Sequence, residues 1–196
     1  MPRSKQIEKE DILRAAAQVI RQKGEGALTV RSIAGELGCS TQPLYYEFTN
    51  MEQLRAALLP YVRKEYLQFR CTNYKEFGQH FLQFARQEKE LFRFVYLRRR
   101  APGETLLDDI NQDETIRLLS QNLEMDPETA RRMHHQMQYR CYGMGVMLAT
   151  DYCDLTEAQI DAELTEFYKV ILRYYKNVTD DAQLQYWLGR SRHLIL

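Results

Sequence analysis

The stretch that decides the fold is TVRSIAGELGCSTQPLYYEF, residues 29–48. Thr29 is a favourable N-cap residue for a short helix. The apolar residues that follow it recur at the spacing of one helical face: Val30, Ile33, Ala34 and Leu37. Gly38-Cys39-Ser40 predicts a turn, because glycine adopts backbone conformations that other residues resist. A second short helix, from about Thr41 to Phe48, completes the layout of a helix-turn-helix unit, whose second helix enters the major groove of DNA.

Helical spacing of apolar residues also extends over the rest of the chain, and convincing period-2 alternation is absent, so we predict an all-α fold. A helix before this stretch ends at Gly24, and a long helix after it runs to about residue 70. Thr49 and Glu52 are expected to cap that long helix as a capping box, and Pro60 is expected to interrupt and kink it. Further helices are predicted near 74–98, 104–123, 127–150, 157–176 and 181–194.

Two of these later helices have well-marked starts. Asp126-Pro127 places a capping residue before a proline at the first helical position, and Thr156 with Gln159 forms a capping box. The predicted organisation is an N-terminal three-helix helix-turn-helix DNA-binding domain over residues 1–50. A larger helical ligand-binding and dimerisation domain is predicted over residues 51–196.

Composition sets broad limits on the function. The 196 residues carry no net charge, but residues 1–64 hold ten Lys/Arg and seven Asp/Glu, a small positive excess that suits a DNA-binding end. The longest uncharged stretch is too short for a membrane span, and the N-terminus lacks the pattern of a secretory signal, so we expect a cytoplasmic protein. The four cysteines lack metal-ligand or disulfide spacing, and we expect them to be reduced.

The second short helix carries side chains suited to reading DNA. Leu44, Tyr45 and Phe48 are its inward-facing candidates. The side chains expected on its exposed face are Thr41, Gln42, Pro43 and Tyr46. Glutamine can pair with the N6 and N7 atoms of adenine, threonine can bond a base or a phosphate, and proline can touch a thymine methyl group. Two short helices with a glycine turn also occur in proteins that never touch DNA, so this pattern alone leaves both readings open.

The residues from Ile12 to Leu54 resemble the N-terminal signature of the tetracycline-repressor (TetR) family of bacterial regulators. The matching segments, in order, are Ile12-Leu13-Arg14-Ala15-Ala16, Gly24, Thr29-Val30-Arg31-Ser32-Ile33-Ala34, Leu37-Gly38-Cys39-Ser40, Leu44-Tyr45-Tyr46, Phe48, Glu52 and Leu54. The resemblance implies a homodimer that binds a palindromic operator in double-stranded DNA and is released by a small-molecule effector.

The resemblance also implies which side chains contact DNA. Carried over by position, those candidates are Thr29, Arg31, Thr41, Gln42, Tyr45 and Tyr46. Ser40 in the turn and Pro43 on the exposed face of the second helix are further DNA-contacting candidates. The chain departs from the family at Met51, where many members have a phosphate-binding lysine, and at Glu47, where histidine is common. Both departures reduce positive charge at the DNA-facing side, and Arg3, Lys5 or Lys9 are candidates to supply further phosphate contacts.

The body of the chain is rich in aromatic residues, which a pocket for a flat or lipophilic molecule would need. The candidate ligand-binding residues are Phe69, Phe81, Phe84, Phe92, Tyr139 and Tyr142. Core packing uses the same residue types, so each of them has a purely structural alternative.

A subunit interface is predicted from a regular apolar seam. Ile160, Leu164, Phe167, Ile171 and Tyr174 step by 4, 3, 4 and 3 residues, as in a helix that packs on a partner at a shallow angle. Met137 and Met144 lie on one face of the preceding helix, and the two helices together predict a four-helix bundle between subunits. The alternative is that the seam packs inside one chain.

Three kinds of function are compatible with these patterns to different degrees. The favoured hypothesis is a dimeric repressor released by a ligand, and the alternative is an activator or partner-dependent regulator without a small ligand. An enzyme is disfavoured, because the sequence has no glycine-rich phosphate loop, nucleophile motif or paired metal ligands. His134 and His135 are adjacent and point about 100° apart on a helix, so they do not form a metal site. No metal or cofactor is predicted.

Overall fold

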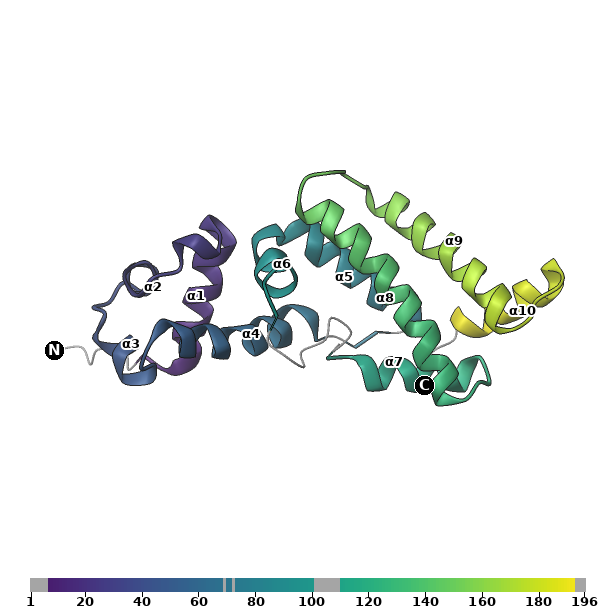
Figure 1. The fold of residues 1–196 in the computed structure, drawn as a ribbon, viewed down its shortest axis with the longest axis horizontal. Coiled ribbons are helices and arrows are strands. Elements are labelled where there is room, and N and C mark those ends of the chain that lie inside the picture. The colour runs from purple at the N-terminus through teal and green to yellow at the C-terminus, as the bar shows by residue number, and fades with distance from the viewer. Residues whose placement is uncertain (1–6, 69, 72, 101–109, 193–196) are drawn as a thin grey trace. The chain divides into compact units, whose positions relative to one another are not determined.

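The computed structural model describes residues 7–68, 70–71, 73–100 and 110–192, and this part of the chain is helical without any strand. The prediction of an all-α fold is therefore confirmed. The elements in chain order are α1 (Lys9–Lys23), the 3-10 helix η1 (Glu25–Ala27), α2 (Val30–Leu37), α3 (Gln42–Glu47), α4 (Met51–Leu67), α5 (Tyr74–Gln87), α6 (Lys89–Tyr96), α7 (Gln112–Asn122), α8 (Pro127–Ala149), α9 (Glu157–Tyr175) and α10 (Asp181–Arg192). Figure 1 labels them.

The chain forms two compact units. The head unit comprises Met1–Tyr66 and Glu88–Arg98, and the body unit comprises Leu67–Gln87 and Arg99–Leu196. The backbone passes between the units at three points, because α6 belongs to the head unit while its neighbours in sequence belong to the body unit. The compact units thus divide the chain differently from the sequence-based boundary at residue 50.

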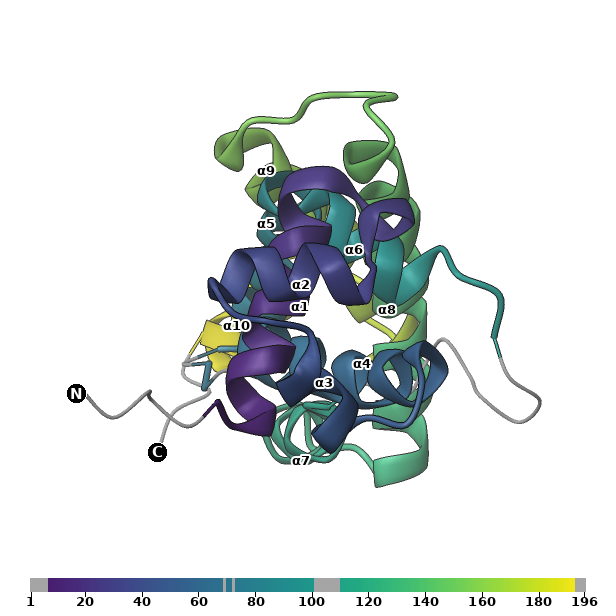
Figure 2. The same ribbon diagram turned by 90° about the vertical axis from the view of Figure 1, so that its left-hand side faces the viewer.

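Helix α1 is the centre of the head unit. Its buried side chains include Ile12, Ala16 and Ile20, each 0% exposed, and both α2 and α6 pack against it. Figure 2 shows α2 crossing α1. The helix ends at Gly24, as predicted, where a φ of 77° stops the helical backbone.

The single helix predicted over 74–98 is wrong, because the structure breaks it at Glu88, whose φ and ψ are −117° and 50°. No glycine or proline marks this break. Its cause is tertiary packing: Leu91 and Phe92 on α6 are both fully buried, and α6 packs on α1. An ion pair of 2.6 Å between Arg21 and Glu88 ties the start of α6 to α1.

Helix α4 also begins differently from the prediction. Asn50, not Thr49, is its N-cap, since the Asn50 Oδ1 atom accepts a hydrogen bond of 2.8 Å from the backbone N–H of Gln53. The Gln53 side chain accepts a bond of 2.7 Å from the backbone N–H of Thr49. The helix continues through Pro60, so the proline does not end it.

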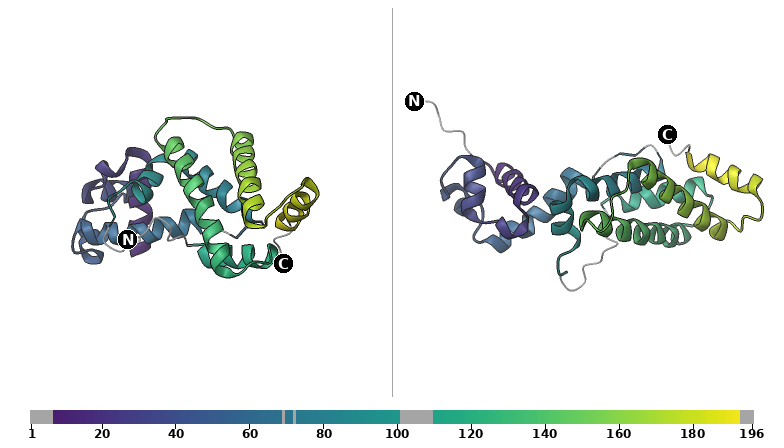
Figure 3. Two further views of the ribbon diagram at one scale, coloured as in Figure 1. Left: turned by 45° about the vertical axis from the view of Figure 1, so that its right-hand side comes forward. Right: turned by 90° about the horizontal axis from the view of Figure 1, so that it is seen from above.

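The body unit is built around α8, which packs against α5, α7 and α9, and α10 packs on α9 and α7. Figure 3 shows α8 and α9 running beside each other. A side chain larger than glycine at position 78 would meet Leu164 and Cys141, so Gly78 lets α5 approach both helices closely. No helix in the described part of the chain combines the length and apolarity needed to cross a membrane.

The starts of α8 and α9 are as predicted. The Asp126 side chain accepts a hydrogen bond of 2.9 Å from the backbone N–H of Thr129. Thr156 and Gln159 form the expected capping box, because each side chain accepts a bond from the backbone N–H of the other. Satisfying the exposed N–H groups at a helix start is worth about 0.5–2 kcal/mol.

We predict that Phe92→Ala destabilises the head unit in particular. Removing a fully buried phenyl ring should lower the free energy of unfolding by about 3–5 kcal/mol. Hydrogen exchange followed by mass spectrometry should then show faster exchange in α1. Faster exchange confined to α5 and α8 would contradict the assignment of α6 to the head unit.

Candidate DNA-binding interface

The start of α2 is held by a reciprocal pair of hydrogen bonds. Thr29 Oγ1 accepts a bond of 3.1 Å from the backbone N–H of Ser32, and Ser32 Oγ accepts one of 2.9 Å from the backbone N–H of Thr29. Ser32 Oγ also lies 2.7 Å from the carbonyl oxygen of Ala27. The predicted cap at Thr29 is therefore confirmed. The role of Ser32 was not predicted, because glutamate or glutamine usually fills that place in a capping box.

The turn after α2 depends on Gly38. Its φ and ψ of 65° and 34° lie in the left-handed region, which disfavours residues with a Cβ atom. The backbone N–H of Cys39 then reaches the Ala34 carbonyl at 3.0 Å and closes the helix end. This turn sets the direction in which the chain enters α3.

Helix α3 has one buried and one exposed face. Leu44 and Phe48 are 2% and 4% exposed and anchor the helix to the head unit. Tyr45 and Tyr46 are 63% and 78% exposed, so the inward position expected for Tyr45 is wrong. Because α3 is short, Leu44 and Phe48, four positions apart, make its buried contacts, and Tyr45 does not lie on the same side of the helix as these two residues. Pro43 lies in the first turn, where a missing backbone N–H costs little.

The predicted DNA-contacting residues lie on α2, on α3 or just before them. Thr29, Arg31, Ser40, Gln42, Tyr45 and Tyr46 are exposed, and Thr41 and Pro43 are half-buried. On α3, the Gln42 Nε2 atom donates a hydrogen bond of 2.9 Å to the Tyr46 hydroxyl. Both side chains therefore occupy the same exposed face, one helical turn apart.

The charged residues near α3 have a mixed pattern. Glu47 is exposed and Met51 is half-buried, so neither adds positive charge to this surface. Lys9, the first residue of α1, places its ammonium group 5.5 Å from the centre of the Phe48 ring. Arg3 and Lys5 lie outside the described residues. Lys9 is thus the described member of the three predicted auxiliary cations, and it lies beside the end of α3.

The predicted ligand-binding aromatics lie in different environments. Phe92 is fully buried in the head unit, where its ring lies 4.8 Å from that of Tyr96. Tyr139 is 57% exposed on α8. Phe81, Phe84 and Tyr142 are half-buried or buried in the body unit, and Phe69 lies outside the described residues. Aromatic content alone could not distinguish these environments, because every one of them uses the same residue types.

The body unit also contains buried polar groups that the sequence analysis missed. The Tyr74 hydroxyl lies 3.1 Å from Nδ1 of His134, and the Tyr168 hydroxyl lies 2.6 Å from the Ser191 hydroxyl. Burial lowers the pKa of His134 to about 3, so this imidazole is neutral at neutral pH. Two buried atoms of α8, His135 Nε2 and Gln138 Oε1, find no hydrogen-bond partner in the described part of the chain.

The seam predicted for a subunit interface is largely used inside one chain. Its buried members have exposed fractions of 1–7%: Met137, Met144, Ile160, Leu164 and Ile171. Phe167 is half-buried and Tyr174 is 75% exposed. The 4, 3, 4, 3 spacing marks an apolar face correctly, but it does not distinguish a partner helix in the same chain from one in a second chain.

The outer, solvent-exposed face of α8 and α9 carries residues other than the buried members of the predicted seam. Tyr139 and Val170 are 57% and 62% exposed on it. Arg140 forms an ion pair with Glu163 and places its guanidinium 5.7 Å from the centre of the Phe167 ring. These contacts hold the two helices together across their exposed side.

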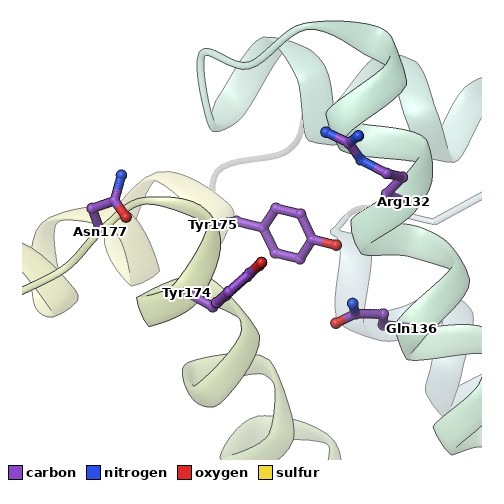
Figure 4. Close-up of a pocket in the computed structure, with 5 residues that line it drawn as sticks. All are labelled: Arg132, Gln136, Tyr174, Tyr175 and Asn177. Atoms are coloured by element: carbon purple, nitrogen blue, oxygen red, sulfur yellow. The ribbon is translucent and has the colours of Figure 1, made fainter.

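A hollow of about 550 Å³ lies between α8 and the end of α9. The residues that line it are Arg132, Gln136, Tyr174, Tyr175 and Asn177. Figure 4 shows Tyr175 reaching from α9 toward α8, with its hydroxyl near Arg132 and Gln136. The rings of Tyr174 and Tyr175 meet edge to face, with centres 5.2 Å apart. None of these residues except Tyr174 was predicted to belong to a site.

The chain is similar to known proteins in its N-terminal sequence and in its fold. Residues 12–58 match the model of bacterial regulatory proteins of the tetR family. A solved structure with the same fold is that of a TetR variant from Acinetobacter baumannii AYE in complex with minocycline, with a TM-score of 0.57 and 18% sequence identity. The alignment covers 89% of this chain and 99% of that chain. No curated protein matches the chain.

We predict opposite effects of alanine at two glycines of the helix-turn-helix unit. Gly38→Ala should lower the free energy of unfolding by about 1–2 kcal/mol, because alanine must adopt the left-handed conformation. Gly35 is exposed within α2, and a Cβ atom there would meet nothing within 4 Å. Gly35→Ala should therefore stabilise the protein by about 0.5–1 kcal/mol.

Chemical denaturation of the two variants and the wild type measures both effects. Equal stability of Gly38→Ala and Gly35→Ala would show that the turn does not require a left-handed residue.

Proposed function

We propose that this chain is a DNA-binding regulator of the TetR family, whose model matches residues 12–58, and that it acts as a homodimeric repressor released from a palindromic operator by a small molecule. The observation that carries the DNA-binding part is the exposed face of α3. Leu44 and Phe48 anchor the helix from behind, which leaves Gln42, Tyr45 and Tyr46 free to enter a major groove. Arg31 on α2 is an exposed cation available to a phosphate.

The interior of the body unit supports a small-molecule effector. A buried polar atom without a hydrogen-bond partner costs about 1–3 kcal/mol, and His135 Nε2 and Gln138 Oε1 on α8 have no such partner among the residues that the structure describes. A ligand or an ordered water that bonds to them would recover that free energy. The similar solved structure is a complex with minocycline, which supports a small molecule as the effector of a protein of this fold.

The position of α6 supports coupling between effector and DNA. Because the backbone passes between the body and head units at both ends of α6 and at the end of α4, a change in the body reaches the head through covalent connections. A coupling free energy of about 1–3 kcal/mol would change operator affinity by about 5- to 150-fold.

We propose that the outer face of α8 and α9 forms the dimer interface. Exposed apolar side chains on one surface are typical of an interaction site, and this face carries Tyr139, Val170 and Tyr174. The hollow lined by Arg132 and Tyr175 lies at the end of the same face, where a partner side chain could enter. This interface uses the solvent-exposed residues of the two helices that carry the predicted seam, and Tyr174 belongs both to that seam and to this face.

Arg31→Ala tests the DNA-binding proposal. Binding of wild type to its own promoter DNA should weaken steeply as the salt concentration rises. In the variant the slope of log affinity against log salt should be smaller by about 1, which corresponds to the loss of one phosphate contact. The measurement is a fluorescence-anisotropy titration at several salt concentrations. Wild-type binding that does not depend on salt would contradict direct contact with the DNA backbone.

The same titration, repeated with small-molecule candidates, separates the repressor from its alternative. Loss of promoter binding on addition of one compound supports the effector-released repressor. Promoter binding that changes only when a second protein is added supports a partner-dependent regulator.

Val170→Glu tests the dimer interface. Val170 is 62% exposed in one chain, so glutamate there is compatible with the fold but would place an unpaired charge in the proposed interface. Sedimentation should show a monomer that binds a palindromic site weakly, because each head reads only half of it. Tyr152→Glu is the matched control, since Tyr152 is 81% exposed outside both helices. An intact Val170→Glu dimer would exclude this face.

A further inference from the structure

The hydrogen bond between Gln42 and Tyr46 bears on how the protein selects a base. The two residues lie four positions apart on α3, and Gln42 Nε2 donates to the Tyr46 hydroxyl over 2.9 Å. Both side chains are exposed, with Tyr46 at 78%, so this bond is formed on the face available to DNA. Leu44 lies between them in sequence and is buried, which fixes the orientation of that face.

A glutamine reads adenine through two atoms of its amide group. The carbonyl oxygen accepts from N6 of adenine, and one N–H donates to N7. A glutamine side chain that rotates freely loses conformational entropy when it binds, at a cost of about 0.5–1.5 kcal/mol per side chain. Its amide can also present its oxygen and nitrogen in the reverse order. Base selection therefore depends on what holds the amide.

Tyr46 supplies such a restraint without consuming the reading groups. The amide has two N–H groups and one oxygen, so the bond to Tyr46 leaves one N–H and Oε1 for adenine. The Tyr46 hydroxyl accepts in this bond, and its own proton remains available to donate to a phosphate oxygen. The arrangement links a contact with the DNA backbone to the reading of a base.

We propose that Tyr46 is a positioning residue for base recognition, whose hydroxyl holds the Gln42 amide in the orientation that reads adenine. This inference rests on the proposed function, because it requires α3 to enter the major groove. It differs from a simple phosphate contact by Tyr46, which would strengthen binding to all sequences equally.

The test is a binding selection from randomised duplex DNA with wild type, Gln42→Ala, Tyr46→Phe and the double variant. Gln42→Ala should lower the preference for adenine at one position of each half-site by about 5- to 150-fold. Tyr46→Phe keeps the ring and removes only the hydroxyl, and it should weaken the preference at that same position. The double variant should lose no more of the adenine preference than Gln42→Ala does, since the two substitutions remove the same interaction.

Tyr45→Phe is the comparison variant, because it removes a hydroxyl from the adjacent exposed tyrosine. It should leave the adenine preference at the Gln42 position intact, even where it changes the affinity for all sequences. A Tyr46→Phe protein with unchanged base preference and uniformly weaker binding would overturn the proposal and leave Tyr46 as a phosphate contact.

A second measurement needs no DNA. Nuclear magnetic relaxation of the Gln42 side-chain amide should show a restricted group in wild type and a more mobile one in Tyr46→Phe. Equal mobility in the two proteins would overturn the positioning role. A restricted amide in a wild type that fails to bind any promoter duplex would overturn both the proposed function and the adenine-reading role, while leaving the hydrogen bond itself established.

Discussion

The presentation of α3 depends on the left-handed backbone at Gly38. This residue ends α2, allows the Cys39 N–H to reach the Ala34 carbonyl, and turns the chain so that Leu44 and Phe48 pack into the head unit. With these two side chains buried, Pro43 is half-buried and the other positions of the six-residue helix are exposed to solvent. The exposed Gln42, Tyr45 and Tyr46 are therefore consequences of one turn and two anchors.

The features that the sequence predicted well are set by local chemistry. Thr29, Asp126 and Thr156 cap helices because their side chains accept hydrogen bonds from backbone N–H groups three residues away, and Gly24 and Gly38 end helices through their own backbone freedom. The cap of α4 shows that such rules are precise to about one residue. Thr49 and Asn50 are both good capping residues, and the structure uses Asn50 where the sequence predicted Thr49.

The features that the sequence did not predict are set by contacts between distant segments. Nothing between residues 74 and 98 marks a break at Glu88, and α6 separates from α5 because its apolar face packs on α1. The same limit applies to the seam of α8 and α9, where spacing reveals an apolar face but not which chain covers it. It also applies to the aromatic residues, since Phe92 and Tyr139 lie in environments as different as a fully buried core and an exposed helix face.

Entry of α3 into the major groove is the claim on which the proposed regulation depends. Amide chemical shifts recorded during titration of the protein with duplex DNA from its own promoter test it most directly. We predict that the largest changes fall on residues 29–46, in α2 and α3 and the segments before them. Changes confined to α8 and α9, or none at a saturating concentration of DNA, would contradict it.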